Sequence, residues 1–312
     1  MRVVIAGGTG LIGRALVRAL VDGGDSVVVL TRRPERTAGL PDGVEAVGWD
    51  GRTLGPWVER LEGADVLVNL AGANIGAGRW TAARKALLRE SRLASTGALV
   101  EALRRLSARP RVFLQASAVG YYGPCAPEEE VTEDHPPGDD FLGRLAREWE
   151  AASAPAEELG VRRVLLRTGV VLSREGGALP RMLLPFRLGL GGRLGSGRQP
   201  FPWIHIADEV GAIRFLMERE GARGPYNLTA PNPVSNAEFT RILARVLGRP
   251  ALIPVPAFAL RLAFGEMGDL LLTGQRAVPR RLLEAGYAFR FPDLEAALRD
   301  LLGKGARAGL VQ

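Results

Sequence analysis

The clearest chemical pattern in this sequence is a set of three glycines, Gly7, Gly10 and Gly13, placed between a short apolar run and a helical pattern. Such glycines permit a tight turn, close approach of the backbone to a pyrophosphate, and close packing of a helix on a strand. The free amide groups at the start of the helix would then face the phosphates. A glycine turn can also simply join a strand to a helix. Here both the strand and the helix are present, and the pattern predicts a dinucleotide site.

A pair of arginines, Arg32 and Arg33, follows Thr31 at the end of the next apolar strand. A cofactor with a free ribose 2′-hydroxyl usually meets Asp or Glu at this place. Arginine instead binds phosphate through two parallel hydrogen bonds, so the pair favours the 2′-phosphate of NADP(H). The alternative is that both arginines are solvated loop charges.

The elements that must position these residues alternate between strand and helix. Apolar, β-branched runs predict strands over 2–6, 26–31, 44–47, 65–70, 111–116, 163–167 and 226–229. Patterns of helical period predict helices over 12–20, 81–106, 141–159, 209–218 and 235–247. This alternation predicts an α/β fold, a Rossmann-type doubly wound parallel sheet with a smaller, mostly helical C-terminal lobe.

The domain organisation follows from changes in composition along the chain. We expect an NADP-binding Rossmann domain over 1–172, to which residues 203–230 return. Residues 173–249 are then partly insertions of the substrate lobe, and 250–302 form a small C-terminal domain. Residues 303–312 are expected to be a frayed tail.

Composition restricts the function classes. The 312 residues carry a net charge of +7, but the arginines are interleaved with acids and no basic block occurs, so we expect no nucleic-acid partner. There is no long uncharged apolar run and no signal-peptide pattern, so we expect a cytoplasmic protein without membrane contact.

The single cysteine, Cys125, can form no internal disulfide, and no Cys/His cluster has the spacing of a metal site, so no metal is expected. The protein is expected to be a monomer or a homodimer.

Several motifs together resemble a known family. They are Gly7-Gly8-Thr9-Gly10-Leu11-Ile12-Gly13, Asn69-Leu70-Ala71-Gly72-Ala73, Ser117-Ala118-Val119-Gly120-Tyr121-Tyr122-Gly123 and Trp203-Ile204-His205-Ile206. The chain resembles the atypical extended short-chain dehydrogenases/reductases, and within them the subfamily of sugar-nucleotide epimerase relatives. The stretch from Gly265 to Tyr287 is similar to that subfamily's small C-terminal domain of unknown function. The resemblance spans nearly the whole chain.

The resemblance implies a reaction whose usual residues are absent. Short-chain reductases place a Tyr and a Lys four residues apart on one helix, where the ammonium lowers the pKa of the phenol and the phenol exchanges a proton. No Tyr-x-x-x-Lys occurs in this sequence, and the matching positions are Phe141 and Leu145. The standard mechanism therefore cannot operate.

Other residues are candidates for catalysis. Ser117 follows the fifth strand, where a catalytic serine would lie, and Tyr121 or Tyr122 can supply a phenol from the same loop. Lys85 lies on the long helix together with Arg84 and Arg92, although exposed cations are common on helices. The last candidate, His205, lies between two isoleucines, an alternation that more often marks a packed histidine.

The expected cofactor site is larger and draws on the glycine turn and on the ends of several strands. Its predicted members are Gly7, Thr9, Gly10, Leu11, Ile12, Gly13, Thr31, Arg32, Arg33, Asp50, Leu70, Ala71, Gly72, Ala116, Ser117 and Thr168. Asp50 would lie near the adenine, although a turn aspartate is an equal interpretation.

Two functions remain open. The first is an NADP-dependent oxidoreductase or epimerase acting on an unidentified small carbonyl or hydroxyl compound, such as a nucleotide-sugar. The second is a non-catalytic NADPH-binding sensor, in which the cofactor stabilises one conformation that a partner recognises.

Overall fold

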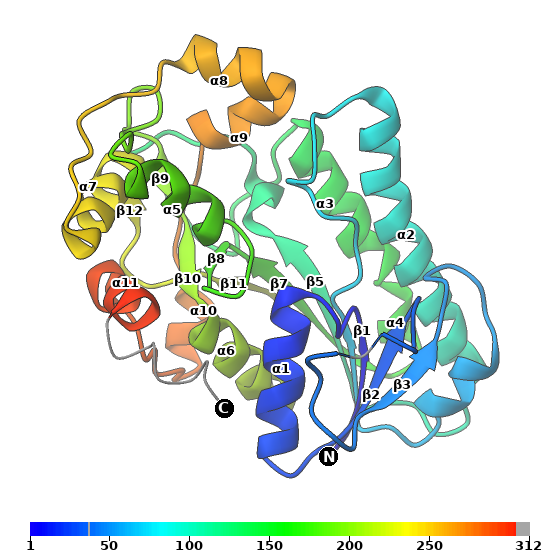
Figure 1. Ribbon diagram of the computed structural model, residues 1–312. Coiled ribbons are helices and arrows are strands. Elements are labelled where there is room, and N and C mark those ends of the chain that lie inside the picture. Colours follow the sequence, from blue (N-terminus) through cyan, green and yellow to red (C-terminus); the bar gives the residue numbers. More distant parts are fainter. Residues whose placement is uncertain (37, 304–312) are drawn as a thin grey trace.

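The fold is built on one seven-stranded, fully parallel sheet (Figure 1). The computed structural model describes residues 1–36 and 38–303; the predicted tail beyond residue 303 lies outside this range. The strand order is β11-β7-β5-β4-β1-β2-β3. The strands are β1 (Arg2–Ala6), β2 (Ser26–Thr31), β3 (Glu45–Gly48), β4 (Val66–Asn69), β5 (Val112–Ala118), β7 (Arg162–Thr168) and β11 (Gly224–Leu228). This confirms the predicted Rossmann-type α/β fold.

The central strands are apolar on both faces because helices cover the sheet from both sides. One face packs against α1 (Leu11–Asp22) and α6 (Ile206–Glu218), and its core contains Val3, Ile5, Leu16 and Leu216. The opposite face packs against α2 (Ala82–Arg105), the 3-10 helix η1 (Pro56–Leu61) and α4 (Pro155–Glu158). The helix α3 (Phe141–Ala152) lies beside α2 on that face (Figure 1).

The helix predicted over 141–159 is divided in the structure into α3 and α4. Pro155 accounts for the break, because it lacks an amide hydrogen and its ring crowds the carbonyl of Ala151 in a continuous helix. As the first residue of α4, Pro155 satisfies the usual preference for proline at that position.

The rest of the chain forms a smaller lobe with its own core. Its helices are α5 (Leu179–Arg187), α7 (Asn236–Leu247), α8 (Ala257–Phe264), α9 (Asp269–Leu272) and α11 (Leu294–Leu302), with the 3-10 helix η3 (Gly265–Gly268) between α8 and α9. The helix α10 (Arg280–Glu284) instead packs against β11, and its Leu282 belongs to the core of the main sheet. Side chains of α5, α7 and α11 meet in one apolar cluster that includes Leu183, Phe239 and Leu298.

The described residues also form three short strand pairs outside the main sheet. The strands β8 (Val170–Leu172) and β10 (Trp203–His205) pair in parallel, as do β6 (Glu130–Val131) and β13 (Arg276–Ala277). A third, antiparallel pair consists of β9 (Pro200–Phe201) and β12 (Val234–Ser235). Among the described residues, no helix is long and apolar enough to cross a membrane.

Candidate active site

The glycine turn between β1 and α1 leaves no space for side chains. Gly7 has a φ of +82°, which favours glycine, and a Cβ built there would lie 2.7 Å from the carbonyl carbon of Leu70. A Cβ on Gly13 would lie 2.4 Å from the carbonyl oxygen of Gly7. The turn therefore holds the start of α1 tightly against the ends of β1 and β4.

The first turn of α1 is open toward a ligand. Its N-cap is Gly10, and no side chain caps its amide groups. A cavity of about 260 Å³ adjoins this helix end, lined by Gly7, Gly10, Leu11, Ile12, Gly13, Leu70, Val170, Val171, Gly177 and Ala178. Uncapped amides at a helix N-terminus attract anions, so the turn fits the pyrophosphate of a dinucleotide.

The arginine pair lies at the end of β2 and is available to a ligand. Both Arg32 and Arg33 are exposed, and within the described residues neither guanidinium makes a hydrogen bond or ion pair. The hydroxyl of Thr31 accepts a hydrogen bond from the amide of Arg33 at 3.3 Å. Two unpaired guanidiniums beside a nucleotide-binding turn suit the 2′-phosphate of NADP(H).

Asp50 is occupied within its own turn. Its Oδ1 accepts hydrogen bonds from the amides of Arg52 and Thr53, and its Oδ2 accepts one from the Thr53 hydroxyl. These hydrogen bonds lower the pKa of the carboxyl group. The geometry is that of a turn aspartate, the second of the two interpretations that the sequence allowed.

The loop after β4 rests on a buried arginine. Arg92 donates hydrogen bonds to the carbonyls of Ala73 and Leu88, and its guanidinium lies 4.8 Å from the ring of Trp149. Burial lowers the pKa of Arg92 to about 10. Its side chain lies directly beneath Gly72, where a Cβ would approach the guanidinium carbon to 3.3 Å. Arg92 therefore supports the loop formed by Leu70, Ala71 and Gly72 from below.

Lys85 lies beside Phe141, the residue matched in the sequence to the usual catalytic tyrosine. Its Nζ is 5.4 Å from the centroid of the Phe141 ring, and Trp80 packs edge-on against the same ring at 5.3 Å. The ammonium also forms an ion pair with Glu266 of the C-terminal lobe at 2.8 Å. The Lys85 side chain is 32% exposed, so it remains within reach of a ligand.

Ser117 belongs to a buried polar network. Its hydroxyl donates a 2.6 Å hydrogen bond to Glu150 Oε1 on α3, and Arg167 on β7 binds both oxygens of the same carboxylate, at 2.9 and 3.0 Å. Burial opposes the charge of Arg167, but Glu150 outweighs it, and the pKa of the guanidinium is raised. Side chains alternate along a strand, so Ala116 and Ala118 face the opposite side of the sheet.

The two tyrosines flank the same arginine. Tyr122 donates a 2.6 Å hydrogen bond to Asn227 Oδ1 and accepts one from Arg167, while the Tyr121 ring stacks on the Arg167 guanidinium at 3.5 Å. Tyr122 is 2% exposed, and burial raises the pKa of its phenol to about 12. A phenol so placed stays protonated at neutral pH, which makes it a poor base.

His205 is packed between the two lobes. Its Nδ1 accepts a hydrogen bond from the amide of Ala207 at the start of α6, and its ring lies 4.0 Å from that of Phe291. Its Nε2 is 3.2 Å from an oxygen of Asp300, without the alignment of a hydrogen bond. Burial lowers the pKa of the imidazole. The arrangement is that of a capping, packed histidine.

Thr168 forms a hydrogen bond with Glu209, an acid that was not among the site residues predicted from the sequence. Its hydroxyl donates a 2.9 Å hydrogen bond to Glu209 Oε1, and Glu209 is fully buried. Burial raises the pKa of Glu209 to about 8. Glu150, Arg167 and Glu266 were also missed. A charged residue inside an apolar strand, as at Arg167, was the available signal.

The site residues form two groups. The glycine turn and the adjoining cavity lie at the end of β1, and the arginine pair lies at the end of the neighbouring strand β2. Ser117, Tyr121 and Tyr122 belong to the separate network around Arg167, and His205 lies apart from both groups. Among the five catalytic candidates, Lys85 has its Nζ over the Phe141 ring.

Comparisons with known proteins place the chain in a family. Residues 3–229 match the model of the NAD dependent epimerase/dehydratase family, and residues 255–301 match a domain of unknown function, DUF1731. The chain is 43% identical to the epimerase family protein SDR39U1 of Bos taurus over 308 residues, covering 97% of this chain and 100% of that one.

Two solved structures are similar as well. The human epimerase family protein SDR39U1, solved with NADPH, matches with a TM-score of 0.87 and 40% identity, covering 96% of this chain and 99% of that chain. A nucleoside-diphosphate sugar epimerase from Corynebacterium glutamicum matches with a TM-score of 0.78 and 37% identity, covering 97% of this chain and 58% of that chain. The predicted cofactor, NADP(H), agrees with the human relative. The chain therefore belongs to the NAD-dependent epimerase/dehydratase family of extended short-chain dehydrogenases/reductases, with DUF1731 as its C-terminal part.

Proposed function

We propose that this protein is an NADP(H)-dependent oxidoreductase or epimerase in which Lys85 takes over proton transfer from the absent tyrosine. The observation that carries the proposal is the position of Lys85 Nζ, 5.4 Å from the centroid of the Phe141 ring. Phe141 occupies the place of the proton-transferring phenol in related reductases and cannot transfer a proton. An ammonium beside it supplies a proton donor and a positive charge at the same point.

The cofactor-binding residues support NADP(H) in particular. The uncapped start of α1 suits the pyrophosphate, and the unpaired Arg32 and Arg33 suit the 2′-phosphate. NADP(H), when bound, supplies or accepts the hydride. The human relative solved with NADPH supports the same choice.

In the reductive direction, Lys85 has two tasks. Its ammonium attracts the carbonyl oxygen of the substrate and stabilises the negative charge that develops there as hydride reaches the carbonyl carbon. It then donates one proton from Nζ to that oxygen, which gives the alcohol. The Glu266 carboxylate, 2.8 Å away, orients the ammonium before the substrate arrives. In oxidation, the same groups act in the reverse order.

The name of one relative supports a choice of substrates to test first. The C. glutamicum relative is described as a nucleoside-diphosphate sugar epimerase. We therefore place nucleotide-sugars first among the small carbonyl or hydroxyl compounds to be tested. An epimerase would oxidise a sugar hydroxyl and return the hydride to the opposite face.

The proposal can be tested with a pool of metabolites in place of a single chosen substrate. The protein is incubated with a metabolite extract and NADPH deuterated at the transferable C4 position, and products are followed by mass spectrometry. A parallel incubation with NADP⁺ detects an epimerase, which returns its hydride internally. Deuterium in one compound, or one converted metabolite, supports an enzyme; NADPH binding without any conversion supports the alternative below.

A non-catalytic NADPH-binding role is the second candidate. It is favoured by the buried network, in which Ser117 and Tyr122 are engaged with Glu150, Arg167 and Asn227. The Asn227 side-chain amide also donates to the carbonyl of Val278, so the network reaches the C-terminal lobe. A sensor would use this connection to transmit the bound state of the cofactor to a partner.

A further inference from the structure

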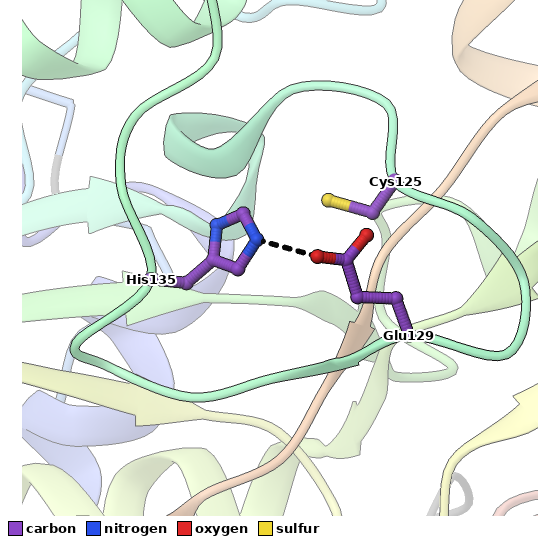
Figure 2. A group of neighbouring side chains, drawn as sticks. All are labelled: Cys125, Glu129 and His135. Carbon is purple, nitrogen blue, oxygen red and sulfur yellow. Dashed lines mark hydrogen bonds and ion pairs between the residues drawn. The ribbon is translucent and has the colours of Figure 1, made fainter.

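The loop between η2 (Val119–Tyr122) and α3 brings three metal-ligating side chains together, outside the site described above. Cys125 Sγ, a carboxylate oxygen of Glu129 and an imidazole nitrogen of His135 all lie within 4.8 Å of one another. Figure 2 shows the three side chains pointing toward one another across the loop. We propose that Cys125, Glu129 and His135 bind one zinc ion.

The hydrogen bonds of His135 support this assignment. Its Nδ1 lies 2.9 Å from the carbonyl oxygen of Pro136, and its Nε2 lies 2.9 Å from Glu129 Oε1, so the ring is fixed between two oxygen atoms with Nε2 directed at the carboxylate. The imidazole and the carboxylate, both zinc-ligating groups, are thus already oriented toward one point. Metal-bound histidines commonly donate their other N–H to a backbone carbonyl in this way.

Cys125 is held in place by its backbone. Its amide donates to the carbonyl of Gly274 at 3.2 Å, and its half-buried thiol lies near the carbonyls of Tyr122 and Gly123. The backbone thus holds Sγ within 4.8 Å of the ligand atoms of Glu129 and His135, where a metal ion would stabilise the thiolate.

The surrounding charge attracts cations. The loop from 128 to 140 contains the acids Glu128, Glu129, Glu130, Glu133, Asp134, Asp139 and Asp140. Glu128 pairs with Arg198 and Asp134 with Arg281, whereas the Glu129 carboxylate bonds to His135. Glu129 is therefore the acid of this group that faces both other ligands.

Zinc fits this donor set better than the hard divalent cations. Magnesium and calcium prefer oxygen ligands alone, while sulfur, nitrogen and oxygen together suit zinc. In a tetrahedral zinc site the ligand atoms stand about 3.3–3.6 Å apart, as follows from bonds of about 2.0–2.3 Å. The 2.9 Å separation of Nε2 and Oε1 must open slightly and Sγ must approach, a small change for the exposed Glu129 side chain. Water would fill the fourth position.

Zinc at this place would cross-link the loop internally, between Cys125 and His135, and the loop itself is already held against the C-terminal lobe. Besides the Cys125–Gly274 hydrogen bond, Gln275 donates to the carbonyl of Gly123 at 2.6 Å, and β6 pairs with β13. These contacts preorganise the ligands, since they do not need the ion. The site could not be recognised in the sequence because its spacing, Cys-x₃-Glu-x₅-His, matches no common zinc pattern.

The test uses the full-length chain, stripped of metal with a chelator and titrated with Co²⁺ as a spectroscopic stand-in for Zn²⁺. We expect one equivalent to bind, with a thiolate-to-cobalt charge-transfer band and the intense visible bands of tetrahedral coordination, and Zn²⁺ to displace it. Cys125→Ser should abolish the charge-transfer band. His135→Gln and Glu129→Gln should weaken binding beyond the roughly 10- to 100-fold that loss of an outer hydrogen-bond partner costs.

Glu128→Gln is the matched control, because Glu128 is an adjacent exposed carboxylate paired with Arg198. It should bind cobalt as the unaltered protein does. A protein that binds no cobalt, or binds it without a thiolate band, would overturn the proposal and leave His135 as a hydrogen-bond partner of Glu129 alone. Equal affinity in the unaltered protein and the His135→Gln variant would overturn it as well.

Discussion

Arg167 binds both carboxylate oxygens of Glu150, at 2.9 and 3.0 Å, and the two side chains are only 4% and 9% exposed. The pair joins β7 to α3 at the place where the active site was expected from the sequence. Two of the catalytic candidates predicted from the sequence contact this pair: Ser117 donates to Glu150, and Tyr122 accepts from Arg167. Their hydrogen-bonding groups are therefore already engaged within the fold.

Removing one partner of the Arg167–Glu150 pair should lower the stability of the protein. Glu150→Gln leaves the buried Arg167 charge without its counter-ion, and we expect a loss of about 3–5 kcal/mol in the free energy of unfolding. Urea denaturation of the unaltered protein and the variant measures this difference in the free energy of unfolding. The control is Glu157→Gln, which removes a largely exposed partner of Arg163 and should cost less than about 1 kcal/mol. Equal effects of the two variants would show that burial does not govern the Arg167 pair.

The arginine pair predicts cofactor preference. Arg32→Ala should weaken NADPH binding by about 10- to 100-fold, since hydrogen bonds between charged groups contribute roughly 1.5–3 kcal/mol. NADH lacks the 2′-phosphate, so its affinity should stay unchanged. Fluorescence titration with both cofactors measures this, with Arg36→Ala as the neighbouring exposed control. If NADPH and NADH lost affinity equally, Arg32 would not contact the 2′-phosphate.

The glycine turn predicts a contrast between two Gly→Ala substitutions. In Gly13→Ala the new Cβ would lie 2.4 Å from the carbonyl oxygen of Gly7. Because this oxygen belongs to the backbone, it cannot move away easily, so NADPH binding and thermal stability should both fall. Gly97→Ala, in an open position on α2, should instead stabilise the protein by about 0.5–1 kcal/mol. Thermal denaturation with and without NADPH compares the two. A tolerated Gly13→Ala would contradict the tight turn.

Glu209 predicts a pH dependence of stability. Its pKa is raised from 4.5 to about 8 by burial, so the folded state holds a proton that the unfolded state releases above pH 4.5. The stability that this proton provides is complete below pH 4.5 and declines as the pH rises to about 8, by a few kcal/mol. Glu209→Gln, which cannot ionise, should not show this decline.

Urea denaturation at about pH 5 and about pH 8 compares the two proteins, since these values span the interval over which the proton is lost. The unaltered protein should lose more stability over this interval than Glu209→Gln. Identical pH profiles would mean that Glu209 is ionised in the folded protein.

The sequence predicted the sheet well because strand and helix periodicity depend on local residues. All seven predicted strands occur within one or two residues of their expected positions, from β1 (Arg2–Ala6) to β11 (Gly224–Leu228). The glycine turn was readable for the same reason: its close contacts, such as Gly13 against Gly7, are made a few residues apart.

Side-chain partners distant in the sequence could not be predicted. Lys85 meets Glu266 from 181 positions away, and Ser117 meets Glu150 from a different element. Whether Ser117 faced the ligand or the helix layer depended on one residue of strand register, which composition does not reveal. His205 was better predicted, because its alternation with two isoleucines is a local feature and indicated packing.

The most direct test of the central claim compares Lys85→Met with Arg89→Met, a cation one turn further along α2 that pairs with Glu148 at the surface. Both variants are first shown to bind NADPH as the unaltered protein does, and each is then incubated with C4-deuterated NADPH and the metabolite extract. We expect the unaltered protein and Arg89→Met to place deuterium in the same compound, and Lys85→Met to do so at least about 100-fold more slowly, the lower range of general acid catalysis. Equal transfer by Lys85→Met would contradict the role of Lys85. No transfer or conversion by any of the three proteins, with either form of the cofactor, would contradict the proposal that the protein is an enzyme.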